Sequence, residues 1–217
     1  MDRSYHDIFS DYPSWSHHTH VLHVEATEEE ADINHGTETI RGEVLEIPEA
    51  ILKRKSIRSF APKGLTDEDV EILIQSAIRA PNAGNIQPWA FVAVRDRDIK
   101  ESLVEAAHGQ SFIAAAPLVI VVCADPERTA PRYGDRGITL YCLQDTAAAV
   151  ENMILTATHN GLGTCWVGAF DEGMAAAALG VPRGIRPVAM IPIGYPDQDP
   201  PPRPRRPVFE VLHRDKW

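Results

Sequence analysis

Apolar residues recur with helical spacing in several parts of the chain. Between Thr66 and Pro81 they fall at i, i+3, i+4, i+7 and i+8 from Val70, which places them on one face of a helix. Thr66 precedes this stretch as an N-cap, and acidic residues fill the first turn. The pattern therefore predicts a buried helix. Similar patterns predict helices over 48–54, 97–107, 145–160 and 171–179.

Continuous apolar runs, in contrast, predict the strands. The run from Leu118 to Ala124 is rich in β-branched residues and has no charged position, which is typical of a central strand buried on both faces. Shorter runs predict strands over 90–94, 164–170 and 188–193, and the stretch 125–135, with its Pro and Gly, is predicted to be a loop. Helices and strands therefore alternate in an α/β arrangement of two or three layers.

The first forty residues follow neither pattern. They hold six of the nine histidines, and residues 1–50 carry twelve acidic and two basic residues, whereas the remainder carries 19 of each. We predict that residues 1–40 are an acidic, His-rich extension, disordered or draped over a partner, and that residues 41–217 form one domain. In an extended segment His18 and His20 share one face and His23 lies on the other, which suits a metal site poorly. A metal-binding or assembly role for the extension is the alternative.

Composition and charge exclude several classes of protein. Hydrophobic residues make up 44% of the chain, close to the value for globular proteins. No apolar run reaches the roughly 18 residues of a membrane span, and the N-terminus lacks the apolar core of a secretory signal. A body without a basic excess argues against nucleic-acid binding. The three cysteines have no paired spacing, so we expect reduced thiols and a cytoplasmic location.

A basic motif follows the first predicted helix. Arg54, Lys55, Ser56 and Arg58 lie within five residues, and an extended backbone would place Ser56 and Arg58 on one face. Such a group can surround an anion through charge-assisted hydrogen bonds. The alternative is a solvated helix end whose cations complement the helix dipole. The sequence lacks the usual phosphate loops, G-x-G-x-x-G and G-x-x-x-x-G-K-[ST].

The C-terminal tail combines prolines, arginines and apolar residues. Residues 192–207 contain seven prolines, which exclude a regular helix or central strand. Arg203 and Arg205 therefore project from a stiff backbone, either toward an anion or as part of a solvated, partner-binding tail. Apolar residues such as Phe209 and Trp217 follow, so we expect the tail to dock on another surface.

Two loops suit a flat ligand. The stretch from Pro81 to Trp89 contains two Asn and a Gln, whose amides donate and accept hydrogen bonds together, as recognition of a heteroaromatic ring requires. The alternative is an ordinary turn with Trp89 in the core. Gly168 and Ala169 would let backbone N–H groups approach a ligand closely. The alternative is a core strand that tolerates small residues.

Together these motifs resemble the nitroreductase family of flavoproteins, and they occur in the family's order over residues 47–217. Arg54–Arg58 match the family's R-R-S-x-R pattern, and Pro81–Trp89 match its P-S-x-x-N-x-Q-P-W loop. Val167–Asp171 match its glycine loop before F-D. Gly194–Pro196 match its closing G-Y-P, and Arg203–Arg206 match its basic tail. Lys55 and Asn82 replace a common Arg and Ser, and residues 112–116 lack the Asn and Lys found there in some members.

The resemblance implies an α+β fold, built as a three-layer α/β/α sandwich with a central mixed sheet and helices on both faces. It also implies a homodimer whose C-terminal tails are swapped onto the partner subunit, with FMN at the interface. The implied activity is ping-pong hydride transfer from NADH or NADPH to a small organic acceptor, such as a nitroaromatic compound or a quinone. The alternative is a flavin-binding or flavin-remodelling protein without nicotinamide turnover.

The resemblance also assigns flavin contacts by position. Arg54, Ser56, Arg203 and Arg205 would hold the phosphate, with Lys55 in the same basic motif, and Arg58 would lie near the pyrimidine edge. Pro81, Asn82, Ala83 and Asn85 would come from the partner subunit, and the backbone of Gly168 and Ala169, with Val167 beside them, would face flavin N5 and O4. Because the flavin carries the hydride chemistry, no catalytic side chain and no metal ligand is predicted.

Overall fold

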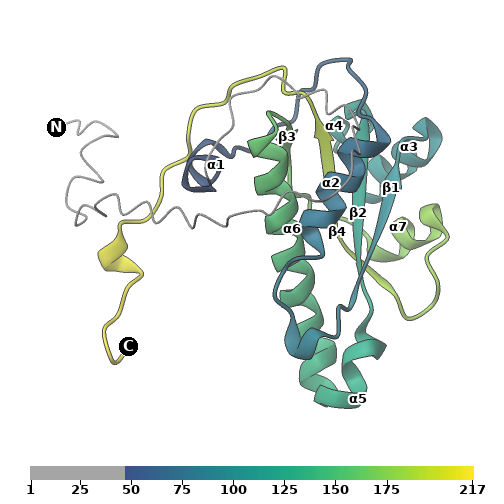
Figure 1. The fold of residues 1–217 in the computed structure, drawn as a ribbon. Coiled ribbons are helices and arrows are strands. Elements are labelled where there is room, and N and C mark those ends of the chain that lie inside the picture. The colour runs from purple at the N-terminus through teal and green to yellow at the C-terminus, as the bar shows by residue number, and fades with distance from the viewer. Residues whose placement is uncertain (1–46) are drawn as a thin grey trace, which may run out of the picture. The chain divides into compact units, whose positions relative to one another are not determined.

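A computed structural model describes residues 47–217 (Figure 1). The predicted extension over residues 1–40 and its histidines lie outside the described residues. The described helices are α1 (Ile47–Lys53), α2 (Asp67–Ala77), α3 (Arg97–Ala106), α4 (Phe112–Ala115), α5 (Pro126–Arg136), α6 (Cys142–His159) and α7 (Glu172–Leu179). The strands are β1 (Trp89–Val94), β2 (Leu118–Ala124), β3 (Gly163–Thr164) and β4 (Arg186–Gly194), and short 3₁₀ turns lie at Ala83–Asn85 and Val208–Glu210.

The four strands form one sheet in the order β1-β2-β4-β3, and all three pairings are antiparallel. Strand β2 lies between β1 and β4, where Val121 pairs with Val92 on one side and Met190 on the other. All seven residues of β2 are buried, as its continuous apolar run predicted. A parallel pairing occurs at the isolated bridge between Ser56 and Thr164.

Helices cover both faces of the sheet because alternate side chains of β2 point to opposite faces. Leu118 and Ile120 pack in a cluster with residues of α2 and α6. Val119 and Val121 pack in a second cluster with residues of α3, α4 and α7. Figure 1 shows α2 and α6 side by side on one face of the sheet, in agreement with their contacts. The predicted three-layer α/β/α fold is therefore confirmed, but the sheet that was predicted to be mixed is antiparallel in all three of its described strand pairings.

The stretch predicted to be a loop, 125–135, is instead the helix α5. Asp125 caps it by accepting a hydrogen bond from the backbone N–H of Arg128 at 3.3 Å, and Pro126 occupies the first turn, where a missing N–H has no cost. The helical geometry breaks at Gly134, with φ 52°, and a π-helix over Gly137–Tyr141 leads into α6. The Pro and Gly were therefore misinterpreted as loop signals.

The strand predicted over 164–170 is much shorter than expected. Continuous pairing ends after Thr164, and Val167 forms only an isolated bridge with Met190. The register of β3 and β4 places Pro192 opposite Cys165, and proline has no N–H to donate to the ladder. The ladder is therefore interrupted after Thr164, although Val167 keeps the same register with β4, and Trp166 between them is exposed.

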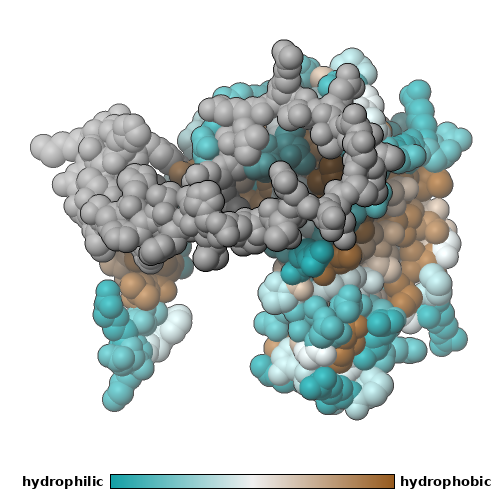
Figure 2. Space-filling view, viewed as in Figure 1, coloured by the Kyte–Doolittle hydropathy of each residue, from teal (hydrophilic) through white to brown (hydrophobic). Residues whose placement is uncertain are grey.

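The C-terminal tail is exposed throughout residues 201–217. Its apolar side chains Val208, Phe209, Leu212 and Trp217 are among the most exposed large hydrophobic residues described. Figure 2 shows brown surface at the lower left, where Figure 1 places the short turn over Val208–Glu210. No helix within residues 47–217 is long and apolar enough to cross a membrane.

Candidate functional site

The basic motif after α1 runs beside strand β3. The backbone N–H of Ile57 donates to the carbonyl oxygen of Thr164 at 2.8 Å, and Ser56 forms the parallel bridge with the same residue. Gly163 permits this approach, because a Cβ at that position would lie 2.8 Å from three carbons of Ile57. A buried Ile57 and a glycine in β3 therefore bring the motif to the sheet edge.

Three of the predicted site residues lie near enough to Cys165 to influence the pKa of its thiol. Burial raises the pKa of this thiol, while the positive charges of Arg58 and Arg54 and a hydrogen bond from Ser56 oppose the rise. Within residues 47–217, no carboxylate lies within ion-pair distance of either Arg54 or Arg58. The guanidinium of Arg58 also lies over the ring of Phe112, at 5.6 Å from its centroid. Two uncompensated cations and a hydroxyl are thus held in one small region, which is a suitable donor set for a phosphate.

Lys55 differs from its neighbours, because its ammonium group forms an ion pair with Asp199. This contact joins the basic motif to the beginning of the C-terminal tail. A second attachment follows nearby, where the backbone N–H of Asp197 donates to the carbonyl oxygen of Ser59 at 3.0 Å. Lys55 is therefore engaged by the tail.

The structure does not bring Arg203 and Arg205 to Arg54 and Ser56 within one chain. Both tail arginines are exposed. The Arg205 guanidinium donates only to nearby backbone, at 3.1 Å to the carbonyl oxygen of Arg203 and 3.3 Å to that of Pro204. The predicted phosphate contact of these two arginines therefore remains a prediction, which requires a second copy of the chain or a movement of the tail.

The loop between α2 and β1 holds an unusual backbone conformation. Gly84, Asn85 and Gln87 have φ values of 59°, 56° and 55°. A left-handed conformation costs a non-glycine residue roughly 1–2 kcal/mol, so other contacts must stabilise it. One is local: the side-chain oxygen of Asn82 accepts a hydrogen bond from the backbone N–H of Gln87 at 2.9 Å. The predicted residues Asn82, Ala83 and Asn85 lie in this turn, and the exposed Pro81 precedes it.

Side chains of α5 and α6 hold the same loop from outside. Arg128 donates to the carbonyl oxygen of Ile86 at 3.1 and 3.3 Å, and Arg132 donates to that of Gly84 at 3.4 Å. From α6, a carboxyl oxygen of Asp145 accepts the backbone N–H of Ala83 at 3.1 Å. Sequence reasoning missed all three side chains. The four-residue spacing of Arg128 and Arg132 was the available signal for a helix there.

The third predicted segment follows β3. Val167 is buried and exchanges two backbone hydrogen bonds with Met190, at 2.9 and 3.0 Å. Gly168 and Ala169 are exposed, and the side-chain amide of Gln110 donates to the carbonyl oxygen of Ala169 at 3.1 Å. A Cβ at Gly168 would meet only the indole nitrogen of Trp166, at 3.9 Å. The backbone at this point is therefore accessible to a ligand.

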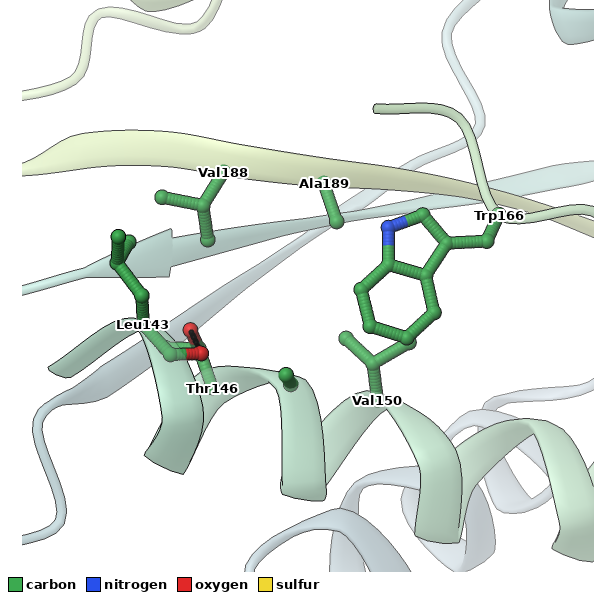
Figure 3. Close-up of a pocket in the computed structure, with 7 residues that line it drawn as sticks. Leu143, Thr146, Val150, Trp166, Val188 and Ala189 are labelled. Atoms are coloured by element: carbon green, nitrogen blue, oxygen red, sulfur yellow. Dashed lines mark hydrogen bonds between the residues drawn. The ribbon is translucent and has the colours of Figure 1, made fainter. Parts of the chain in front are cut away.

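An apolar pocket of about 200 Å³ lies between α6 and β4 (Figure 3). Trp166, 42% exposed, closes one end, with its ring over Val150. Leu143 and Val188 lie at the other end. The hydroxyl of Thr146 is directed to the helix backbone, with carbonyl acceptors at 2.9 and 3.0 Å. The pocket therefore offers mostly apolar contact. Among the described residues, no cluster of His, Cys, Asp or Glu is arranged to hold a metal ion.

Known proteins match the region that carries these features. A model described as the Nitroreductase family matches residues 51–114 and 106–195. An Archaeoglobus fulgidus protein named as a candidate NADH dehydrogenase/NAD(P)H nitroreductase is 35% identical over 179 residues, which cover 77% of this chain and 96% of the relative. An NADPH-flavin oxidoreductase from Vibrio harveyi is 29% identical, covering 78% of this chain and 73% of the relative.

A solved structure supports the same relationship. The NADPH:FMN oxidoreductase from Vibrio harveyi, complexed with NAD⁺, aligns with a TM-score of 0.73 and 28% identity, covering 79% of this chain and 77% of that one. The chain belongs to the nitroreductase family. The predicted fold and the predicted class of enzyme, an oxidoreductase of the nitroreductase type, are confirmed.

Proposed function

We propose that this protein binds FMN and uses it to pass electrons from NADH or NADPH to a small organic acceptor, such as a nitroaromatic compound or a quinone. One observation carries the proposal. Arg54, Ser56 and Arg58 converge beside Cys165, and the accessible backbone of Gly168 and Ala169 follows a few residues later in the chain. An anion-binding group and an open backbone segment are therefore built onto the same stretch of chain.

The chemistry of these donors fits FMN. Arg54 and Ser56 are suited to the phosphate, and Arg203 and Arg205 would join them from a tail that docks on a second subunit. Arg58, which no carboxylate neutralises within residues 47–217, is suited to the pyrimidine edge, where positive charge favours the anionic reduced ring. The backbone amides of residues 167–169 would contact the central ring, and Lys55 would link the basic motif to Asp199.

When bound, FMN would supply the hydride chemistry, in alternating half-reactions with nicotinamide and acceptor. The chain's own residues orient the ring, neutralise its charge and leave one face accessible. We assign no proton transfer to a side chain, and no residue is proposed as a catalytic acid, base or nucleophile.

We further propose a homodimer in which the loop residues Pro81, Asn82, Ala83 and Asn85 serve the flavin of the partner subunit. No hydrogen bond or ion pair within the described part of the chain links this loop to Arg54–Arg58 or to Gly168, which supports a role toward a second site. The exposed apolar tail and the pocket beside Trp166 supply the surface that a partner would cover. The free cysteines agree with a cytoplasmic location.

Purified protein tests the proposal directly. We expect a yellow protein that releases FMN, and not FAD, when acid-denatured and chromatographed, and that oxidises NADH or NADPH in the presence of a quinone. Recovery of no flavin after reconstitution would refute flavin binding. Bound FMN without nicotinamide oxidation would favour a flavin-binding or flavin-remodelling protein instead. A chain starting at Arg41 should behave identically if residues 1–40 are an extension outside the domain.

A further inference from the structure

Asp145 is a buried acid on α6 whose two carboxyl oxygens have different surroundings. The residue is 5% exposed. One oxygen accepts the backbone N–H of Ala83 at 3.1 Å, across 62 positions in the sequence. The other oxygen is buried and has no hydrogen-bond partner within residues 47–217. Figure 1 shows the turn between α2 and β1 beside the start of α6, where this contact is made.

Stability alone does not explain an acid at this position. A buried polar atom without a partner destabilises a fold, and an apolar residue of similar size would avoid that penalty. Burial also raises the pKa of the Asp145 carboxyl, and the hydrogen bond from Ala83 only partly opposes the rise. The one hydrogen bond that this carboxyl accepts within residues 47–217 comes from the loop, so this bond is the feature that accounts for the acid.

The hydrogen bond to Asp145 satisfies a backbone N–H of the loop that has no acceptor within its own turn. Ala83 opens the 3₁₀ turn over Ala83–Asn85, and the first N–H groups of a helical turn have no acceptor within it. The left-handed residues Gly84 and Asn85 follow immediately. Arg128 and Arg132 hold the carbonyl side of the loop but are exposed to water, whereas the bond to the buried Asp145 is partly shielded from water and meets less competition.

We propose that Asp145 is a positioning residue that fixes the loop over 82–85 in its flavin-binding conformation through the N–H of Ala83. The proposal rests on the proposed flavin site. Asp145 itself does not touch the ligand; it keeps Asn82 and Asn85 in place before binding. Without it the loop must be ordered when the ligand binds, and the affinity for FMN decreases.

The test compares two substitutions of Asp145 in the full-length protein. Asp145→Asn keeps a side-chain oxygen that can accept the Ala83 N–H, so we expect an FMN dissociation constant within about threefold of wild type. Asp145→Ala removes the acceptor, and we expect about tenfold weaker binding or more, since the loop must then be ordered when FMN binds. The matched control is Asn152→Ala, because Asn152 lies on the same helix and its amide donates to the carbonyl oxygen of Ser76 at 3.2 Å, away from the loop. It should lower the melting temperature but leave FMN affinity within twofold.

If Asp145→Ala folds poorly, a substitution of the donor residue Ala83 in the loop still tests the proposal. Ala83→Pro removes the N–H, and the extended backbone of Asn82, with φ −150° and ψ 156°, suits a residue before proline. We expect Ala83→Pro to weaken FMN binding more in wild type than in Asp145→Ala, because both changes remove the same hydrogen bond, whereas any flavin contact of Ala83 itself is lost in both backgrounds.

Equal losses from Asp145→Asn and Asp145→Ala, or fully additive losses in the double variant, would overturn the proposal. So would an unchanged FMN affinity in Asp145→Ala. Failure of wild type to bind FMN would instead overturn the proposed function, so the two failures are distinguishable.

Discussion

Arg54 and Arg58 show how a few side chains define the candidate site. They lie beside the buried thiol of Cys165, together with Ser56, and have no ion-pair partner within residues 47–217. A cation that no carboxylate of the described residues neutralises is available for an external anion. Arg97 is different, because it lies 4.0 Å from Glu101 one helical turn away. The chemistry of the site therefore depends on which arginines the fold leaves uncompensated.

The first prediction concerns the phosphate. Arg54→Ala and Arg205→Ala should each weaken FMN binding by about ten- to a hundredfold, because a charge-assisted hydrogen bond contributes roughly 1.5–3 kcal/mol. Riboflavin, which lacks the phosphate, should bind nearly as in wild type, and Arg97→Ala is the control. The double variant should lose less than the sum of the single losses if both arginines touch one phosphate. Equal losses for FMN and riboflavin in titrations would mean that the arginines support the fold.

The second prediction concerns pH and Asp145. Burial raises the pKa of this carboxyl above its ordinary 3.8, so the folded state binds the proton more tightly than the unfolded state. The wild type therefore loses stability as pH rises from about that ordinary value through the raised folded-state pKa, and the loss is complete above it. Asp145→Asn does not titrate.

The melting temperature of Asp145→Asn minus that of wild type should therefore increase with pH across this window and then level off. Thermal denaturation in a series of buffers measures the difference. A difference that is constant or that shrinks with rising pH would show that Asp145 ionises freely in the folded protein.

At the scale of secondary-structure elements, the basic motif is positioned by the close approach of its backbone to that of β3. The motif is attached to β3 by the bond from Ile57 to Thr164, and Gly163 leaves the space that Ile57 fills. The loop between α2 and β1 is placed in a similar way by α5 and α6, whose side chains hold both its N–H and its carbonyl groups. Elements with no predicted flavin contact thus determine the geometry of those that are predicted to have one.

The third prediction concerns the close approach of Ile57 to Gly163 in β3. Gly163→Ala would place a Cβ 2.8 Å from the branched side chain of Ile57, which is buried and cannot turn away. We expect a loss of about 1–3 kcal/mol in unfolding free energy, as for other overpacked cores, together with weaker FMN binding. Gly64→Ala is the control, since its Cβ would meet nothing within 4 Å. Urea denaturation and flavin titration of both variants measure the two effects.

At the scale of the whole molecule, the C-terminal tail presents an exposed apolar surface that a partner could cover. Phe209 is 79% exposed in the single chain, and the other apolar residues of the tail are exposed as well. Arg203 and Arg205 lie in the same tail and reach only its own backbone. A second copy of the chain would bury the apolar side chains and could receive the two arginines at its basic motif.

The fourth prediction follows from this arrangement. Light scattering should give twice the mass of one chain for the wild type. A chain that ends at Asp199 should lose the dimer or lose FMN, because it lacks the apolar anchors and both tail arginines. Phe209→Ser should shift the dimer toward monomer at low concentration, with Lys216→Ser as a control in the same exposed tail. A stable wild-type monomer that retains flavin would contradict the prediction.

Local features of this protein were readable from the sequence because their physical causes are local. Thr66 caps α2 as predicted, with a hydrogen bond to the backbone N–H of Asp69 at 3.1 Å. The run Leu118–Ala124 is the central strand, since only a strand buried on both faces is apolar at every position. The family was recognisable for a related reason, because its motifs are short contiguous stretches in a constant order.

Other features were decided by tertiary structure, because they depend on residues far apart in the chain. The strand predicted over 164–170 ends early because Pro192 lies opposite Cys165, a pairing that exists only in the folded sheet. The helix α5 was missed because Asp125 and Pro126 also suit a turn, and only packing selects between the two. Asp145 could not be identified at all, since its partner Ala83 is 62 positions away and nothing local marks the contact. Sequence determined which residues are predicted to bind flavin, because their motifs are contiguous, and the tertiary structure decided which groups hold them in position.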